Sequence, residues 1–233
     1  MSTVAIIPAR GGSQRIPRKN LKLFDGQPII AWSIRTALAS GLFDEVVVST
    51  DDDEIAEVAR AHGAQVPFRR PANLADHHTG TTAVIQHALQ ALGSAHDLAC
   101  CIYATAPLLQ AWDLLQGLMA LQADGDKCFA FSVCSFAFPV QRALRLDGQG
   151  GVAPLYPEFV PMRSQDLAPA WHDAGQFYWG RRDAWLQGLP MFAGHSVPVV
   201  LPRHRVQDID TPEDWRRAEY LFAALKAAGE LTL

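Results

Sequence analysis

Apolar residues gather in five short runs along the first 135 residues of the chain. The runs cover residues 4–7, 45–50, 65–68, 98–103 and 128–133. Short, nearly continuous apolar runs bounded by turn residues are typical of strands that are buried on both faces of a parallel sheet. The pattern therefore predicts five strands in this part of the chain.

Between the runs, apolar residues recur three or four positions apart, which is the spacing of a helix with one buried face. Four such helices are predicted to begin near residues 29, 51, 79 and 113. Acids at residues 51–54 suit the first turn of a helix, and threonines at residues 79–82 suit a helix cap. Strands that alternate with helices in this way predict a doubly wound α/β sheet, with a ligand crevice at the carboxyl ends of its strands.

The pattern changes after residue 135. Glycines, prolines and isolated apolar residues interrupt any helical period from residue 136 to residue 159. We interpret residues 136–175 as an irregular, partly β-stranded arm or dimerisation insert within one domain of residues 1–233. Strands are predicted again at residues 176–180 and 197–201. Thr211 and Pro212, followed by two acids, predict the start of the last helix.

Composition limits the classes of protein that the chain can belong to. Its 233 residues suffice for one sizeable core, and 49% apolar with 19% charged residues is an ordinary globular balance. The net charge of −4 argues against general nucleic-acid binding. The start of the chain does not resemble a signal peptide, and the apolar runs are too short to cross a membrane. The four cysteines lack CxxC spacing, so we expect a cytoplasmic protein with reduced thiols.

The loop after the first predicted strand is strongly basic. From residue 10 to residue 22 it has no acid and five positive charges: Arg10, Arg15, Arg18, Lys19 and Lys22. Gly11 and Gly12 can adopt positive φ and turn backbone N–H groups toward a ligand, while Ser13 and Asn20 add neutral donors. These features predict a site for a triphosphate. The alternatives are a solvated basic loop and a loop that grips a nucleic-acid backbone.

Two aspartates precede the last predicted helix. In an extended segment residues two apart face the same side, so Asp208 and Asp210 can direct two carboxylates to one point. Mg²⁺ is commonly held by one or two carboxylates together with substrate phosphates. The pair therefore predicts a magnesium site. The structural alternative makes Asp210 the N-cap of the helix and Asp208 a solvated loop residue.

A second block of chemistry-bearing residues lies between residues 163 and 179. Arg163 suits two-pronged recognition of a carboxylate. Phe177, Tyr178 and Trp179 can form the wall of a sugar pocket. The alternative, which we favour for Phe177 and Trp179, is a strand that contributes aromatic side chains to the core.

Several motifs resemble those of one enzyme family. Ile-Pro-Ala-Arg-Gly-Gly-Ser at residues 7–13, with Pro-Arg-Lys-Asn at 17–20, resembles the opening motif of the CMP-sialic acid synthetases. Neither GxGxxG nor GxxxxGK[ST] fits this loop. Arg-Ser-Gln-Asp-Leu at 163–167 and His-Asp-Ala-Gly-Gln-Phe-Tyr-Trp at 172–179 resemble the pseudaminic acid cytidylyltransferases within that family. Gln14 departs from the pattern, because many members have Lys there.

The resemblance implies a Rossmann-like fold of the nucleotide-diphospho-sugar transferase type and a homodimer. It implies that CTP and pseudaminic acid, an acidic nine-carbon sugar, give the CMP-sugar and diphosphate. Implied catalytic residues are Arg10, Lys19, Asp208 and Asp210, with Mg²⁺ on the two aspartates. Implied nucleotide-binding residues are Arg10, Gly11, Gly12, Ser13, Gln14, Lys19, Asn20, Arg70 and Thr81. Implied sugar-binding residues are Arg142, Arg163, Gln165, Gln176 and Tyr178.

Two alternatives stay open at this point. The same reaction on N-acetylneuraminate or another ulosonic acid would need the same motifs. A non-catalytic nucleotide-binding regulator, with Gln14 as the sign of lost catalysis, belongs to a different class of protein. We expect neither a nucleic acid nor a membrane as a partner in any of these cases.

Overall fold

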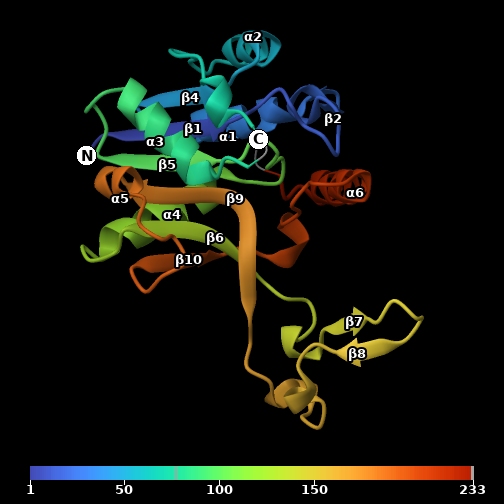
Figure 1. Ribbon diagram of the computed structural model, residues 1–233. Helices are drawn as coiled ribbons and strands as arrows, with labels where there is room; N and C mark the ends of the chain where they lie inside the picture. Colours follow the sequence, from blue (N-terminus) through green and yellow to red (C-terminus); the bar gives the residue numbers. More distant parts are fainter. Residues whose placement is uncertain (77, 232–233) are drawn as a thin grey trace.

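The computed structural model describes residues 1–76 and 78–231. Within these residues a six-stranded sheet has the order β10-β6-β9-β5-β1-β4 (Figure 1). Neighbouring strands run parallel except at β9, which is antiparallel to both β5 and β6. The strands are β1 (Thr3–Pro8), β4 (Glu45–Ser49), β5 (Leu98–Ile102), β6 (Phe129–Ser135), β9 (Trp171–Arg181) and β10 (Ser196–Val200).

Helices cover both faces of this sheet (Figure 1). Successive residues of β1 point to opposite faces, so Ala5 and Ile7 pack into one core while Val4 and Ile6 pack into the other. Burial on both faces explains why β1 is continuously apolar. The first core contains α1 (Ile29–Ser40), α2 (Asp53–Ala61) and α4 (Ala111–Ala123), and the second contains α3 (Thr81–Ala91) and α5 (Arg182–Gln187).

A third core lies beside the loop that follows β1. The rings of Trp215 and Phe222 pack edge-on against Phe24, with centroid separations of 5.5 and 5.2 Å. Ile16 and Ile209 are buried in the same core. This packing fixes the basic loop next to the segment that contains Asp208 and Asp210. The strand and helices that contribute to this core are β2 (Leu23–Phe24), α1 and α6 (Pro212–Ala228), and β3 (Gln27–Pro28) pairs with β2.

Several predicted elements differ from the structure. Residues 65–68 do not form a strand, because only Gln65 pairs with β4, through one isolated bridge to Val47. The third predicted helix begins at Thr81 with Gly80 as its N-cap, and Thr79 bonds to Asp76 instead of capping it. The strand predicted at residues 176–180 extends from residue 171 to residue 181. Helix α5 was not predicted.

The region after β6 leaves the sheet and projects away from it (Figure 1). We call residues 136–170 the arm, which is five residues shorter than predicted because β9 begins at Trp171. The arm contains the antiparallel hairpin of β7 (Leu144–Leu146) and β8 (Val152–Pro154). Phe138, Leu146 and Val152 are exposed on it.

Six short 3₁₀ helices complete the described part of the chain. They are η1 (Lys19–Leu21), η2 (Ala72–Leu74), η3 (Val140–Arg142), η4 (Pro157–Phe159), η5 (Ser164–Asp166) and η6 (Arg203–Arg205). Over residues 1–76 and 78–231, every helix is too short or too polar to span a membrane.

Candidate active site

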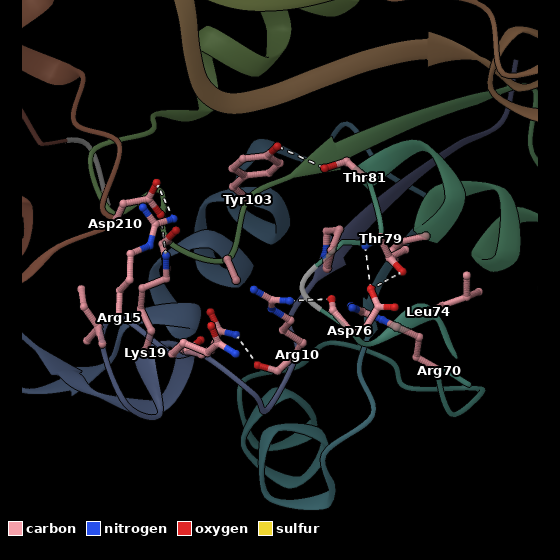
Figure 2. Close-up of a pocket in the computed structure, with 18 residues that line it drawn as sticks. Arg10, Arg15, Lys19, Arg70, Leu74, Asp76, Thr79, Thr81, Tyr103 and Asp210 are labelled. Carbon is pink, nitrogen blue, oxygen red and sulfur yellow. Dashed lines mark hydrogen bonds and ion pairs between the residues drawn. The ribbon is translucent and has the colours of Figure 1, made fainter. Parts of the chain in front are cut away.

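A cavity of about 290 Å³ lies at the carboxyl ends of β1 and β5, and we call it the loop cavity (Figure 2). The loop after β1, the segment that leads into α3 and the end of β5 form its walls. This is the crevice position predicted from the alternation of strands and helices. Polar side chains that line it include Arg10, Ser13, Gln14, Arg15, Lys19, Asn20, Arg70, Asp76, Thr79, Thr81, Tyr103 and Asp210.

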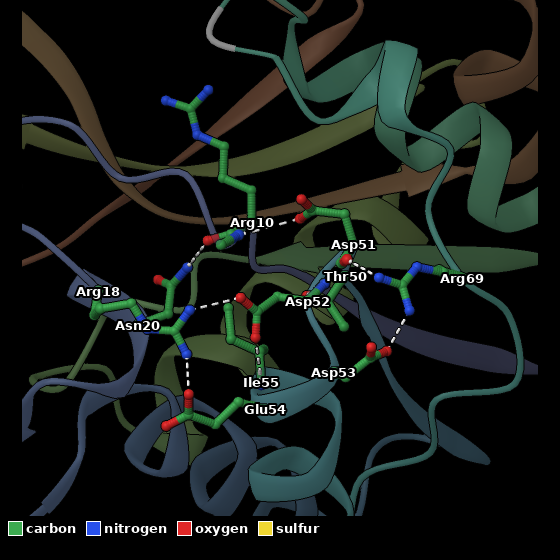
Figure 3. Close-up of polar contacts among 11 residues, drawn as sticks. Arg10, Arg18, Asn20, Thr50, Asp51, Asp52, Asp53, Glu54, Ile55 and Arg69 are labelled. Carbon is green, nitrogen blue, oxygen red and sulfur yellow. Dashed lines mark hydrogen bonds and ion pairs between the residues drawn. The ribbon is translucent and has the colours of Figure 1, made fainter.

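The basic loop is fixed by contacts within the protein (Figure 3). The buried side-chain amide of Asn20 donates to the backbone oxygen of Arg10 at 2.9 Å. Arg18 pairs with Asp52 at 2.7 Å and also with Glu54. Asp52 in turn accepts the Ile55 N–H at 3.0 Å and caps α2. Although partial burial opposes them, the hydrogen bonds from Ile55 and Arg18 hold the pKa of Asp52 below its ordinary value.

Gly11 and Gly12 do not have the predicted positive φ, and neither lines the loop cavity. Their role in nucleotide binding stays a prediction. The N–H of Gly11 donates to Asp51 Oδ1 at 3.1 Å, and a Cβ at position 11 would lie 2.5 Å from Asp52 Oδ2. Gly11 is therefore needed for the close approach of the loop to α2, whereas nothing lies within 4 Å of a Cβ at Gly12.

Arg70 forms a fixed positive wall of the loop cavity. Its side chain donates to the hydroxyl of Ser49 at 3.2 Å and to the Ser49 backbone oxygen, and the residue is only 4% exposed. Burial lowers the pKa of Arg70 to about 10; the nearby charge of Arg10 lowers it further and that of Asp51 raises it. The guanidinium is thus still protonated at neutral pH, and it is held in place without a ligand.

Asp210 faces two cations at the end of the loop cavity (Figure 2). Its carboxylate lies 2.9 Å from Arg15 Nη2 and 3.5 Å from Lys19 Nζ. The N-cap of α6 is Thr211, which forms a capping box with Asp214. The alternative in which Asp210 is the N-cap is therefore wrong, because the Thr211 side chain caps the helix.

A second cavity, of about 460 Å³, lies on the other side of Asp210, and we call it the acidic cavity. Asp173, Asp208, Asp210 and Asp214 line it together with Arg203 and Arg217. Asp208 is exposed at this cavity. Partial desolvation, followed by the charge of Asp210, raises the pKa of Asp208, while the charge of Lys19 acts in the opposite direction. Asp210 is the residue at which the loop cavity and the acidic cavity meet.

The carboxylates around the acidic cavity suit a magnesium ion. Among the described residues, no three or more His, Cys, Asp or Glu side chains are grouped so that they could hold a metal by themselves. Mg²⁺ does not need such a cage, because it is commonly bound by one or two carboxylates, waters and substrate phosphates. Asp208 and Asp210 supply two carboxylates next to a cavity lined by cations, so this donor set fits.

Comparisons with known proteins agree with this geometry. A family model described as cytidylyltransferase matches residues 4–144. The chain is also 47% identical to the pseudaminic acid cytidylyltransferase of Campylobacter jejuni over 225 residues, which are 95% of this chain and 97% of that protein. The chain belongs to the cytidylyltransferase family. It is a nucleotidyltransferase, as the motifs at residues 7–20 and 163–179 predicted.

Two further proteins are similar to this cytidylyltransferase. A pseudaminic acid cytidylyltransferase of Helicobacter pylori, fused to a hydrolase, is 33% identical over 210 residues, which are 90% of this chain and 40% of that protein. A CMP:2-keto-3-deoxy-manno-octonic acid synthetase solved with CTP has a TM-score of 0.70 at 20% identity, covering 96% of this chain and 99% of its own. The latter confirms the predicted fold class.

The structure brings most of the predicted nucleotide residues of this cytidylyltransferase together. Seven of them line the loop cavity, and only Gly11 and Gly12 do not. Asp210 lines both the loop cavity and the acidic cavity, whereas Asp208 lines the acidic cavity alone. The seven residues are Arg10, Ser13, Gln14, Lys19, Asn20, Arg70 and Thr81.

The predicted sugar residues are placed differently. Arg142, Arg163 and Gln165 lie on the arm and line neither cavity of their own chain. Gln176 and Tyr178 are buried in β9, at 1% and 3% exposure, and do not line either cavity. Phe177 and Trp179 are fully buried in the core, which confirms the structural alternative for both.

Tyr103 and Asp173 were missed at the level of sequence. The hydroxyl of Tyr103 lies 3.2 Å from Thr81 Oγ1 in the wall of the loop cavity. The hydroxyl of Tyr178 donates to Asp173 Oδ2 at 2.7 Å, so a buried tyrosine orients a carboxylate of the acidic cavity. The position of Tyr103 as the last residue of a predicted apolar strand was a signal for it, because strand ends border the crevice. Asp173 gave no comparable signal.

Proposed function

We propose that this cytidylyltransferase transfers CMP from CTP to pseudaminic acid and releases diphosphate. The observation that carries the proposal is the 47% identity, nearly end to end, to an enzyme named for this substrate. The loop cavity supports it, because Arg10, Arg15, Lys19 and Arg70 supply four positive charges for a triphosphate.

The bond changes in this reaction are simple. The anomeric hydroxyl oxygen of the sugar attacks the α-phosphorus in line, the bond from that phosphorus to the bridging oxygen breaks, and diphosphate leaves with its electron pair. The hydroxyl proton is released to solvent. Such transfers depend on positioning and on stabilisation of the charge that develops on phosphate oxygens. We assign this stabilisation to Arg10 and Lys19, with Arg70 as a fixed contact.

We assign the binding of Mg²⁺ to Asp208 and Asp210. When bound, the ion would neutralise phosphate charge and polarise the bonds to phosphorus. Lys19 donates to the Ile209 backbone oxygen at 2.6 Å, and it thereby positions the segment that carries both aspartates. Asp173, held by the hydroxyl of Tyr178 and the N–H of Gly175, faces the same cavity and is available to accept a hydrogen bond from the sugar.

We further propose that residues 1–233 form one domain and act as a homodimer in the cytoplasm. The exposed apolar side chains of the arm favour a second copy as its partner, because Leu146 is 82% exposed and Phe138 83%. In such a dimer Arg142, Arg163 and Gln165 would reach the sugar site of the other copy. The four free cysteines are consistent with a reducing compartment.

A substrate panel tests the proposed function. Purified enzyme with CTP and Mg²⁺ is given pseudaminic acid or N-acetylneuraminate, and release of diphosphate is followed. We expect pseudaminic acid to have the highest kcat/KM. Release with N-acetylneuraminate alone would reassign the substrate, and no release with any acidic sugar, while CTP still binds, would favour the regulator.

A further inference from the structure

The carboxylate of Asp210 is occupied by two side chains that belong to the same loop. Arg15 Nη2 lies 2.9 Å from Oδ2, and Lys19 Nζ lies 3.5 Å from Oδ1 (Figure 2). Each oxygen of the carboxylate therefore faces one cation. These are the oxygens that a metal ion at Asp210 would need.

The two cations are held to different degrees. Lys19 has a second acceptor, the Ile209 backbone oxygen at 2.6 Å, and its side chain is 20% exposed. The Arg15 side chain is 65% exposed, and Asp210 is the only acceptor that the described residues offer to its guanidinium. Arg15 can therefore leave Asp210 without breaking any other polar contact, whereas Lys19 cannot.

Arg15 also lines the loop cavity. Its neighbour Gln14 is neutral, so position 14 provides no charge to a triphosphate in that part of the cavity. A guanidinium released from Asp210 would find phosphate oxygens within the same cavity, and phosphate is the better partner because it offers several charged acceptors to the planar fork.

We infer that Arg15 is an exchangeable counter-ion of Asp210, which passes to the triphosphate when metal and nucleotide bind. The inference rests on the proposed function. It assigns Arg15 two opposite effects: it competes with metal for Asp210 in the nucleotide-free enzyme, and it binds CTP once the metal is in place. Metal and CTP then strengthen each other's binding, because either ligand favours the separation of Arg15 from Asp210, which the other ligand also needs.

Mn²⁺ is a suitable probe, because its free concentration can be measured by electron paramagnetic resonance. The wild type and Arg15→Gln are titrated with Mn²⁺ alone, and CTP binding is measured by calorimetry with Mn²⁺ present and no sugar. Arg69→Gln is the matched control: the Arg69 side chain is 62% exposed, close to the 65% of Arg15, but it pairs with Asp53 and lines neither the loop cavity nor the acidic cavity. Melting curves check that all three proteins are folded.

We expect Arg15→Gln to bind Mn²⁺ about two- to fivefold more tightly than the wild type without nucleotide, since an exposed ion pair is lost as a competitor. We expect the same variant to bind CTP roughly tenfold more weakly in the presence of Mn²⁺, since a charged hydrogen bond to phosphate is lost. Arg69→Gln should leave both affinities unchanged.

Opposite changes in the two affinities are the signature of exchange. If Arg15→Gln weakens both, Arg15 merely helps to build the site, and the inference is wrong. If both affinities stay at wild-type values, Arg15 neither competes nor binds nucleotide, and the inference is equally wrong. A wild type that binds CTP but no Mn²⁺ would overturn the exchange together with the metal site, while the sugar panel would still decide the proposed function.

Discussion

The loop cavity and the arm are built in opposite ways. Arg70 and Asn20, which border the cavity, are 4% and 6% exposed and bind backbone oxygens of Ser49 and Arg10. On the arm, Arg163 pairs with Asp166, only three residues away, and Leu146 is exposed. Contacts of buried side chains preorganise a site, whereas contacts of exposed side chains hold a segment less firmly. We therefore expect nucleotide binding to need only one chain, and we propose that the arm packs against a second copy.

The largest effect is expected from breaking a buried ion pair of the core, which tests the contrast between buried and exposed contacts. Arg205 bonds to both oxygens of Asp113 at 2.6 and 2.9 Å, and their side chains are 12% and 4% exposed. Asp113→Ala leaves the Arg205 charge buried and unpaired, so we expect a loss of about 3–5 kcal/mol in the free energy of unfolding. Urea unfolding followed by circular dichroism measures it. A loss below about 1 kcal/mol would show that this part of the core is not preorganised as described.

The next test removes charge from the residue that the two cavities share. Asp210→Asn keeps the size of the side chain and leaves the capping box of Thr211 and Asp214 intact, so the fold should not change. Turnover should fall about 10²–10³-fold, which is typical for the loss of a charge-stabilising group. Steady-state assays at limiting Mg²⁺ measure it. Near wild-type turnover under these conditions would contradict the metal assignment.

A smaller effect is expected from Arg163 on the arm. An ammonium cannot reproduce the two-pronged contact of a guanidinium with a carboxylate, so Arg163→Lys should lower kcat/KM for the sugar about ten- to a hundredfold. CTP binding, measured by calorimetry without sugar, should stay at the wild-type value. If CTP binding falls by the same factor, Arg163 belongs to the nucleotide site or to the fold, and the division between core and arm is wrong.

The smallest effect is expected from the ion-pair partner of Arg163. Asp166→Ala also removes an aspartate that accepts two bonds from one arginine, at 2.8 and 3.3 Å, but both side chains are exposed. Exposed pairs contribute about 0.2–1 kcal/mol to stability, so unfolding should change by no more than this. The urea experiment used for Asp113→Ala gives the direct comparison. A loss close to that of Asp113→Ala would show that the arm is as firmly built as the core.

Elements with a strong local signal were predictable from the sequence. The strand at residues 4–7 was confirmed because burial on both faces makes it continuously apolar. The strand at residues 65–68 was wrong, because Gln65 lies at the outer edge of β4 and only one bridge forms there. The antiparallel direction of β9 depends on the path of the arm. The local spacing of apolar residues does not indicate that path.

In the candidate site, too, features with a local sequence signal were predictable, and contacts between distant residues were not. That the basic loop would line a cavity was predictable from its concentration of positive charge, although neither of its adjacent glycines lines that cavity. The reason for Gly11 was not, since its constraint comes from Asp52, 41 residues further along the chain. The Arg15–Asp210 and Tyr178–Asp173 contacts were also beyond sequence reasoning, because both depend on side-chain directions in the folded chain.

The two ends of the arm meet in the sheet, where Ser135 of β6 pairs with Trp171 of β9. An excursion that leaves and re-enters at paired positions can be exchanged without shifting the register of any strand. The arm can therefore be replaced as one segment. If the arm binds the sugar as proposed, replacement of residues 136–170 would change the sugar preference of the enzyme and leave the loop cavity as it is.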